Sequence, residues 1–108
     1  PKNGRIRELN DAIRPLRYGR GTVVITNGIS ALGDEAVKTI MAQVRTFDAL
    51  SEENDPWGEH DFGAFEHDGE KIFWKIDPYD LSMQAHSPNA ANAAVTHRVL
   101  TVMLASEY

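Results

Sequence analysis

The side chains best able to do chemistry in this 108-residue chain gather in one short stretch and just beyond it. Glu59, His60 and Asp61 are consecutive, and Asp77 follows the next apolar segment. An imidazole beside a carboxylate can orient a general base or ligate a transition metal, and carboxylates alone suit Mg²⁺ or Ca²⁺. His60 and Asp77 are therefore the candidate catalytic pair. The candidate metal ligands are Glu59, His60, Asp61 and Asp77.

A structural role for the same residues is the favoured interpretation. Neighbouring residues of a strand point to opposite faces, so Glu59, His60 and Asp61 cannot all converge on one ion. Cross-strand polar pairs commonly stabilise sheets, and no nucleophile accompanies this pair. We expect His60 and Asp77 to close the end of a hairpin, with no metal and no other cofactor. A small metal-dependent hydrolase is the alternative.

Several other chemistries are excluded by what the sequence lacks. The chain has no cysteine, which rules out disulfides, thiolate catalysis and cysteine zinc sites. It contains neither the glycine-rich phosphate loop that ends in Gly-Lys-Ser/Thr nor a Gly-x-Ser-x-Gly nucleophile motif. Binding is therefore favoured over catalysis.

Aromatic residues beside the acidic stretch predict a recognition surface. Trp57 sits in a polar loop between Pro56 and Gly58, where an indole can contact a partner. Aromatic side chains are enriched at protein interfaces. We expect a protein partner or a second copy of the chain to bind here. The predicted binding residues are Trp57, Glu59, His60, Asp61 and Tyr79.

Charge is distributed unevenly along the chain, although the formal net charge is −5. Residues 48–80 carry eleven acids against two lysines, whereas residues 1–20 carry six basic residues against two acids. The basic segment could hold phosphate, so nucleic-acid binding is a further alternative, but a solvated helix face is favoured. The arginines of this segment are Arg5, Arg7, Arg14, Arg17 and Arg20.

No apolar run approaches the roughly 20 residues that a membrane-spanning helix needs, and no secretory signal is visible. The absence of cysteine fits a reducing compartment. We therefore expect a cytoplasmic protein that does not contact a membrane.

Apolar periodicity predicts the elements that position these residues. Residues 4–15 and the segment that begins at residue 34 carry apolar side chains at helical spacing, the second with a stripe from Val37 to Phe47. Residues 22–26 are rich in β-branched side chains and predict a buried strand. The apolar spacing of residues 95–106 predicts a last helix.

Asp68-Gly69 predicts the tip of a hairpin between residues 62–67 and 71–76. A type I′ turn pairs Gly63 with Trp74 and His60 with Asp77, whereas a bulged turn pairs Phe62 with Trp74, and the sequence does not choose between them. In either register Trp74 should be buried. The whole chain, residues 1–108, is expected to be a single α+β domain of about three helices packed on a small antiparallel sheet with a central hairpin.

Three segments of the chain resemble a family of small proteobacterial proteins of unknown function, often carried on plasmids. The segments are Asn-Asp-Pro-Trp-Gly-Glu-His-Asp-Phe-Gly at residues 54–63, Phe-Trp-Lys-Ile-Asp at 73–77 and Arg-Val-Leu-Thr-Val-Met-Leu-Ala-Ser-Glu-Tyr at 98–108. The resemblance runs from about Leu9 to Tyr108. It departs at Pro78, where the family pattern has Tyr, and at Asn89 and Asn92, where it has Asp. The resemblance implies a cytoplasmic bacterial accessory protein, and it is compatible with a mobile-element factor that interferes with host defence.

Overall fold

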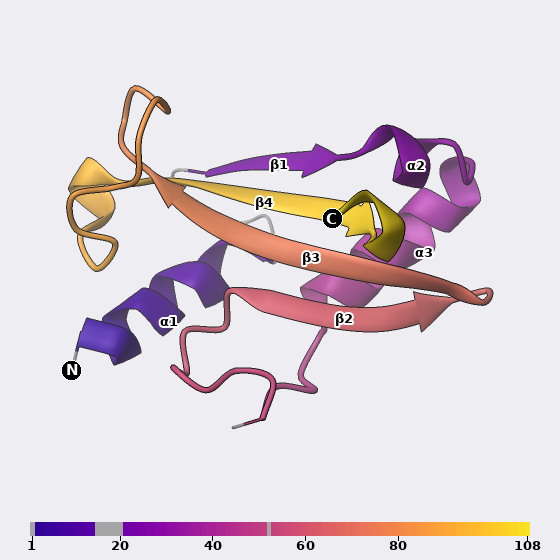
Figure 1. Cartoon of the computed structure of the whole chain (residues 1–108), viewed down its shortest axis with the longest axis horizontal. Helices are drawn as coiled ribbons and strands as arrows, with labels where there is room; N and C mark the ends of the chain where they lie inside the picture. The colour runs from indigo at the N-terminus through magenta and orange to yellow at the C-terminus, as the bar shows by residue number, and fades with distance from the viewer. Residues whose placement is uncertain (1, 15–20, 52) are drawn as a thin grey trace.

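The computed structural model describes residues 2–14, 21–51 and 53–108. Its four strands form one mixed sheet in the order β1-β4-β3-β2 (Figure 1). The elements are α1 (Lys2–Ile13), β1 (Gly21–Ile25), α2 (Asn27–Ser30), α3 (Asp34–Arg45), β2 (Phe62–His67), β3 (Glu70–Tyr79), β4 (His97–Leu104) and two single-turn 3₁₀ helices, η1 (Ala93–Val95) and η2 (Ala105–Glu107).

The α+β class and the hairpin are confirmed, and the predicted helices at both 4–15 and 34 onwards are present as α1 and α3. The sheet is not purely antiparallel, because β1 runs parallel to β4. Among the described residues, no helix has the length and apolar character needed to cross a membrane.

The prediction of a last helix over residues 95–106 is wrong, because most of this segment is the central strand β4. Apolar side chains occupy both faces of β4: Leu100 and Val102 are buried on one face, and Val99 and Met103 on the other. An apolar run of this kind satisfies helical spacing as well as it satisfies a doubly buried strand, so periodicity alone cannot separate them.

The predicted strand at residues 22–26 exists as β1, but it is not buried. β1 lies at the edge of the sheet and pairs with β4. Residues 21–24 are exposed, with Val23 and Val24 at 37% and 40% exposure. β-branched composition indicates a strand without indicating its position in the sheet.

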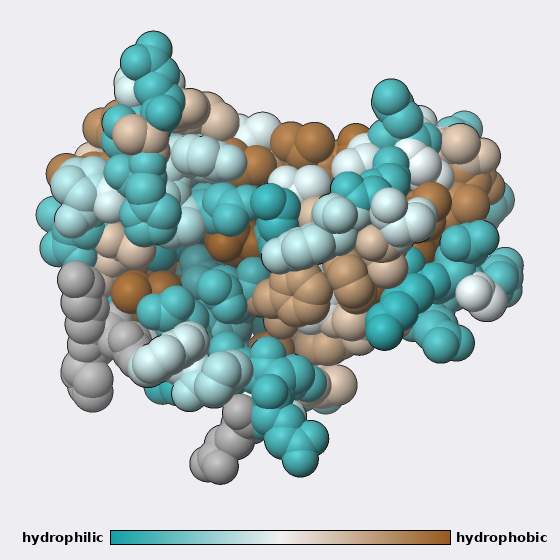
Figure 2. Space-filling model, viewed as in Figure 1, coloured by the Kyte–Doolittle hydropathy of each residue, from teal (hydrophilic) through white to brown (hydrophobic). Residues whose placement is uncertain are grey.

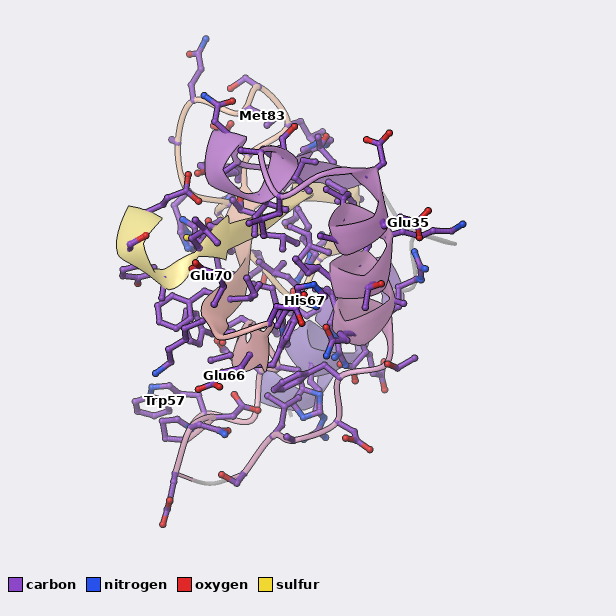
Figure 3. All side chains as sticks on the ribbon, turned by 90° about the vertical axis from the view of Figure 1, so that its right-hand side faces the viewer. Glu35, Trp57, Glu66, His67, Glu70 and Met83 are labelled. Carbon is purple, nitrogen blue, oxygen red and sulfur yellow. The ribbon has the colours of Figure 1, made fainter. Side chains whose placement is uncertain are left out.

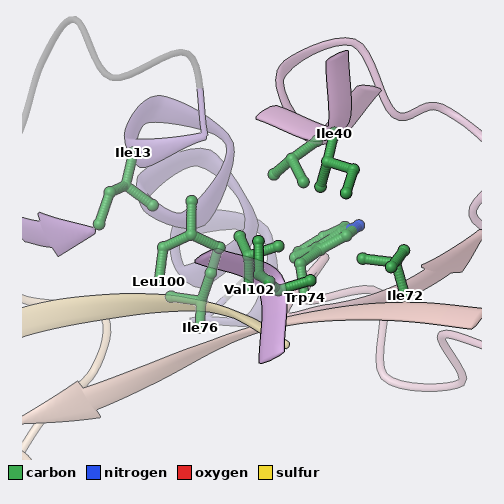
Figure 4. Close-up of a cluster of buried hydrophobic side chains, with 9 residues drawn as sticks. Ile13, Ile40, Ile72, Trp74, Ile76, Leu100 and Val102 are labelled. Carbon is green, nitrogen blue, oxygen red and sulfur yellow. The ribbon is translucent and has the colours of Figure 1, made fainter. Parts of the chain in front are cut away.

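The helices supply the apolar layer that covers one face of the sheet. Inward side chains of all three helices pack against those of β3 and β4 (Figure 4). The buried core residues are Ile13, Ile29, Ile40, Val44, Ile72, Trp74, Ile76, Leu100 and Val102. At roughly 1.5–3 kcal/mol per buried large apolar side chain, this layer supplies the main driving force for folding.

The hairpin adopts the type I′ register. Gly63 pairs with Trp74, and Asp68 and Gly69 both have positive φ, at 48° and 82°. Trp74 is fully buried, as predicted. The absence of a side chain at Gly63 makes room for the indole, because a Cβ atom there would lie 2.3 Å from Trp74 Nε1.

Gly63→Ala should destabilise the protein by about 1–3 kcal/mol, because the added methyl group overpacks the core against the indole. Urea denaturation of the variant gives the free energy of unfolding. Trp74→Phe removes the clashing edge of the ring, so the double variant should show a favourable coupling energy between the two sites. Additive effects would show that the Gly63–Trp74 contact is not the cause.

Candidate functional site

A pocket of about 570 Å³ opens beside the start of β2, where β3 continues past it and is paired with β4 only. β2 begins at Phe62, opposite Lys75, so the last residues of β3 have no partner from β2. The pocket is walled by α1, the segment before β2, the end of β3, the loop of residues 86–90 and the start of β4. Figure 2 shows a hollow lined by hydrophilic residues left of centre on this face.

The loop before β2 is held in shape by polar residues of the motif at residues 54–63. The Asp55 carboxylate, 7% exposed, accepts hydrogen bonds from the backbone amides of Glu59 and His60. Asn54 accepts from the Ser51 amide and donates to the Ala49 carbonyl. Gly58 adopts φ +65°, which glycine accommodates without strain. Much of the motif therefore serves the loop itself.

His60 does not pair with Asp77, which corrects the sequence-based prediction. His60 adopts φ +54° and so leaves the extended conformation before β2 begins. Its Nδ1 lies 2.8 Å from Asp11 Oδ1 on α1, and its Nε2 lies 3.6 Å from Asp55 Oδ2. Asp77 instead forms an ion pair with Lys75, at 2.8 Å. The imidazole ties the loop to α1 rather than closing the hairpin.

Three predicted site residues, Glu59, Asp61 and Asp77, do come together along the pocket wall. Burial raises the pKa of both Glu59 and Asp61, and repulsion from neighbouring carboxylates adds to it. Among the described residues, no three His, Asp or Glu side chains are placed to hold a metal ion together.

The other two predicted binding residues lie outside the pocket lining. Trp57 is 74% exposed at the tip of the loop, on the side of the molecule away from α3 (Figure 3). Tyr79 lies at the end of β3, paired with His97 of β4 and bridged to His86. Trp57 is therefore accessible to a partner, and Tyr79 anchors the following loop.

The sequence did not identify Arg98 and Asn10, which form the floor of the pocket. Arg98 is 5% exposed; its Nε donates to Asn10 Oδ1 at 2.7 Å, and its Nη2 donates to the Ala90 carbonyl. Asn10 Nδ2 donates to the Glu59 carbonyl at 2.9 Å. A signal did exist for Asn10, because a polar residue between Ile6 and Ile13 interrupts the apolar stripe of α1. Arg98 was hidden by the wrong assignment of its segment to a helix.

Among the described N-terminal arginines, Arg14 does not share a surface with Arg5. Arg14 is buried, with its guanidinium 4.9 Å from the centre of the Trp74 ring and Nη1 donating to the Phe47 carbonyl at 2.6 Å. Arg5 is exposed and paired with Glu8. Arg17 and Arg20 lie outside the described residues. Arg14 thus stabilises the core instead of offering its charge to phosphate.

The pocket combines one buried guanidinium with carboxylates on the facing wall. Its hydroxyl-bearing side chain, Ser87, is buried and hydrogen-bonded to Thr96 at 2.7 Å. This arrangement can bind charged groups. His86 also lines the pocket, and its Nδ1 lies 3.1 Å from the Ser87 carbonyl oxygen, whereas the Ser87 hydroxyl is bonded to Thr96 and to the Asn89 amide.

The model of a family described as a protein of unknown function (DUF3768) matches residues 25–107. The chain belongs to this family. The DUF3768 match covers the pocket residues before β2, on β3, in the loop of residues 86–90 and on β4, whereas Ile6 and Asn10 lie before it. No curated protein and no solved structure is similar enough to this chain to match it.

Replacing Glu59 and Asp61 by Gln and Asn should change how stability depends on pH. Because the folded state raises the pKa of both carboxyl groups, it binds more protons than the unfolded chain between the unfolded and folded pKa values. The free energy of unfolding contributed by these groups therefore falls as pH rises through that window. At pH 7 the double variant should have a higher melting temperature than the wild type, and this difference in melting temperature should vanish near pH 3. Glu70→Gln, at an exposed position of the hairpin, is the control.

His60→Ala should lower the free energy of unfolding by about 1 kcal/mol, the scale of one hydrogen bond, because the contact with Asp11 is lost. Urea denaturation measures the effect. His60→Asn retains tolerance for positive φ while removing the imidazole, so it separates the contact from backbone strain. An unchanged stability in both variants would show that the loop is held by Asp55 alone.

Proposed function

We propose that this chain is a non-catalytic binding module that holds a protein partner on the face of its sheet opposite the helices. The observation that carries the proposal is a cluster of three aromatic rings on that face. The rings belong to Phe62, Phe73 and Tyr108.

The three rings come from β2, β3 and the residue after η2. Phe62 and Phe73 lie 5.0 Å apart between centroids, and Tyr108 meets them edge-on at 6.1 Å and 5.7 Å. Tyr108 is 76% exposed. Aromatic rings of this kind, rigid and partly exposed, supply much of the energy at protein interfaces.

Cationic and apolar groups continue the aromatic cluster. Lys71 Nζ lies 5.8 Å from the centre of the Phe73 ring. A shallow second pocket of about 350 Å³ lies against Tyr108, lined also by Met103 and Thr101 of β4. An apolar centre bordered by charged side chains matches the usual arrangement of an interface core and rim.

The proposal extends to a biological role with which the sequence resemblance is compatible. We place the module in the bacterial cytoplasm as an accessory factor of a mobile element, with a component of a host defence system as its partner. The support is the similarity to small plasmid-borne proteins together with a surface suited to binding.

Tyr108→Ala should weaken partner binding at least tenfold, because it removes the most exposed ring of the cluster without disturbing the buried core. The partner is isolated on the immobilised chain, identified, purified and titrated calorimetrically against each variant. Sedimentation of the chain alone tests whether the partner is a second copy.

Leu81→Ala is the matched control, since Leu81 is 58% exposed but lies outside the aromatic cluster. It should leave the affinity unchanged. Full affinity of both Tyr108→Ala and Phe73→Ala would refute the proposal that this face holds the partner.

A further inference from the structure

The Arg98 guanidinium is buried without an ion-pair partner among the described residues, although the charge of Glu59 acts on it from a longer distance. Both of its hydrogen-bond acceptors, Asn10 Oδ1 and the Ala90 carbonyl, are neutral. No carboxylate of the described residues lies within 4.0 Å of its guanidinium. Burying an uncompensated cation is costly, and the guanidinium retains further N–H donors. An anion with two oxygens, such as a carboxylate, would satisfy both needs.

The facing wall of the same pocket has the opposite imbalance. Glu59 and Asp61 are partly buried, and neither forms an ion pair with a described Lys, Arg or His. Asp77, the third carboxylate of the pocket, is neutralised by Lys75 at 2.8 Å. Two carboxylates in this position favour an ammonium group that can donate hydrogen bonds to both.

Asn10 lies between the two walls of the pocket and is hydrogen-bonded to both Arg98 and Glu59. Its side-chain oxygen fixes Arg98, while its side-chain nitrogen fixes the backbone of Glu59. The charges of Glu59 and Arg98 affect each other, yet they stay more than 4.0 Å apart. A polar cavity is thereby held open between a cation and two anions.

We propose that this pocket binds a small zwitterion, whose carboxylate meets the Arg98 guanidinium and whose ammonium group lies between Glu59 and Asp61. A free α-amino acid is the simplest such ligand. This site is distinct from the aromatic cluster, so it does not depend on the protein-binding proposal.

The size of the pocket and its balance of charge select this class. A volume of about 570 Å³ lies within the range of small-molecule sites and leaves room for an amino-acid side chain. A simple anion would leave Glu59 and Asp61 unpaired, and a simple amine would leave Arg98 unpaired. Only a ligand with both charges compensates both walls.

The test titrates the whole chain with each of the twenty free L-amino acids at pH 7, by calorimetry and by amide chemical shifts of the pocket residues. Each amino acid that binds is compared with its deaminated carboxylic acid and its decarboxylated amine. At least one amino acid should bind with a Kd below 1 mM, a threshold that corresponds to about −4 kcal/mol. Its two single-charge analogues should bind at least tenfold more weakly.

Variants locate the ligand. The double variant Glu59→Gln/Asp61→Asn preserves the shape of both side chains. It should lower the affinity for the amino acid at least tenfold and should not lower the affinity for the deaminated acid. Arg98→Gln should weaken both, but it also removes a link between α1 and the loop of residues 86–90, so the carboxylate variant is the deciding one. Glu70→Gln is the control and should bind as the wild type does.

Three results would overturn the proposal. The first is that none of the twenty amino acids shifts the resonances of the pocket residues. The second is that the deaminated acid binds as tightly as the amino acid. The third is that the double variant Glu59→Gln/Asp61→Asn leaves amino-acid binding intact. The second result would indicate a site for anions only. Because the aromatic cluster is unchanged in every one of these variants, partner binding can succeed or fail independently.

Discussion

The burial of Trp74 is the constraint on which the rest of the structure depends. Three parts of the chain contact its indole: Gly63 of β2 leaves room for it, Phe47 after α3 meets it edge-on at 5.5 Å, and the guanidinium of Arg14, the residue after α1, lies over its ring. Nε1 of the indole has no hydrogen-bond acceptor among the described residues. One side chain thus fixes the hairpin register, the position of α1 and the end of α3. Of these elements, α1 and the β3 strand of the hairpin also line the pocket.

Local signals in the sequence were enough to predict the hairpin and two helices, because the turn type and the amphipathic stripe are properties of neighbouring residues. Asp68-Gly69 adopts positive φ at both positions, and the apolar stripe from Val37 to Val44 lies within α3, although Phe47 follows the end of the helix. The strand β4 escaped prediction because its burial is determined by β1 and β3, which lie far away in sequence. Its apolar residues face both the helices and the opposite side of the sheet, a pattern that local periodicity cannot distinguish from a buried helix.

The site was predictable only where its residues are close in sequence or on the same hairpin. Glu59, Asp61 and Asp77 could be grouped from the hairpin alone, since they flank its open end. The partner of His60 could not, because a single positive φ turns its side chain from β3 towards α1. Arg98 and Asn10 meet across 88 positions of sequence, and only the tertiary fold brings them together. Charge compensation across such distances is visible only when the full set of neighbours is known.

The placement of β4 between β1 and β3 has a consequence for how the chain folds. β1 pairs only with β4, in parallel, with Gly21 opposite Arg98. β1 therefore has no neighbouring strand until β4 has formed. The hairpin of β2 and β3 closes locally and can form early, whereas β1 can join only when β4, which lies far along the chain beyond α2, α3 and the hairpin, is in place. Such high contact order slows folding and leaves an unpaired, β-branched segment open to other chains in the meantime. The rate at which the sheet is completed, rather than the strength of its core, therefore sets how long a newly made molecule is exposed to aggregation.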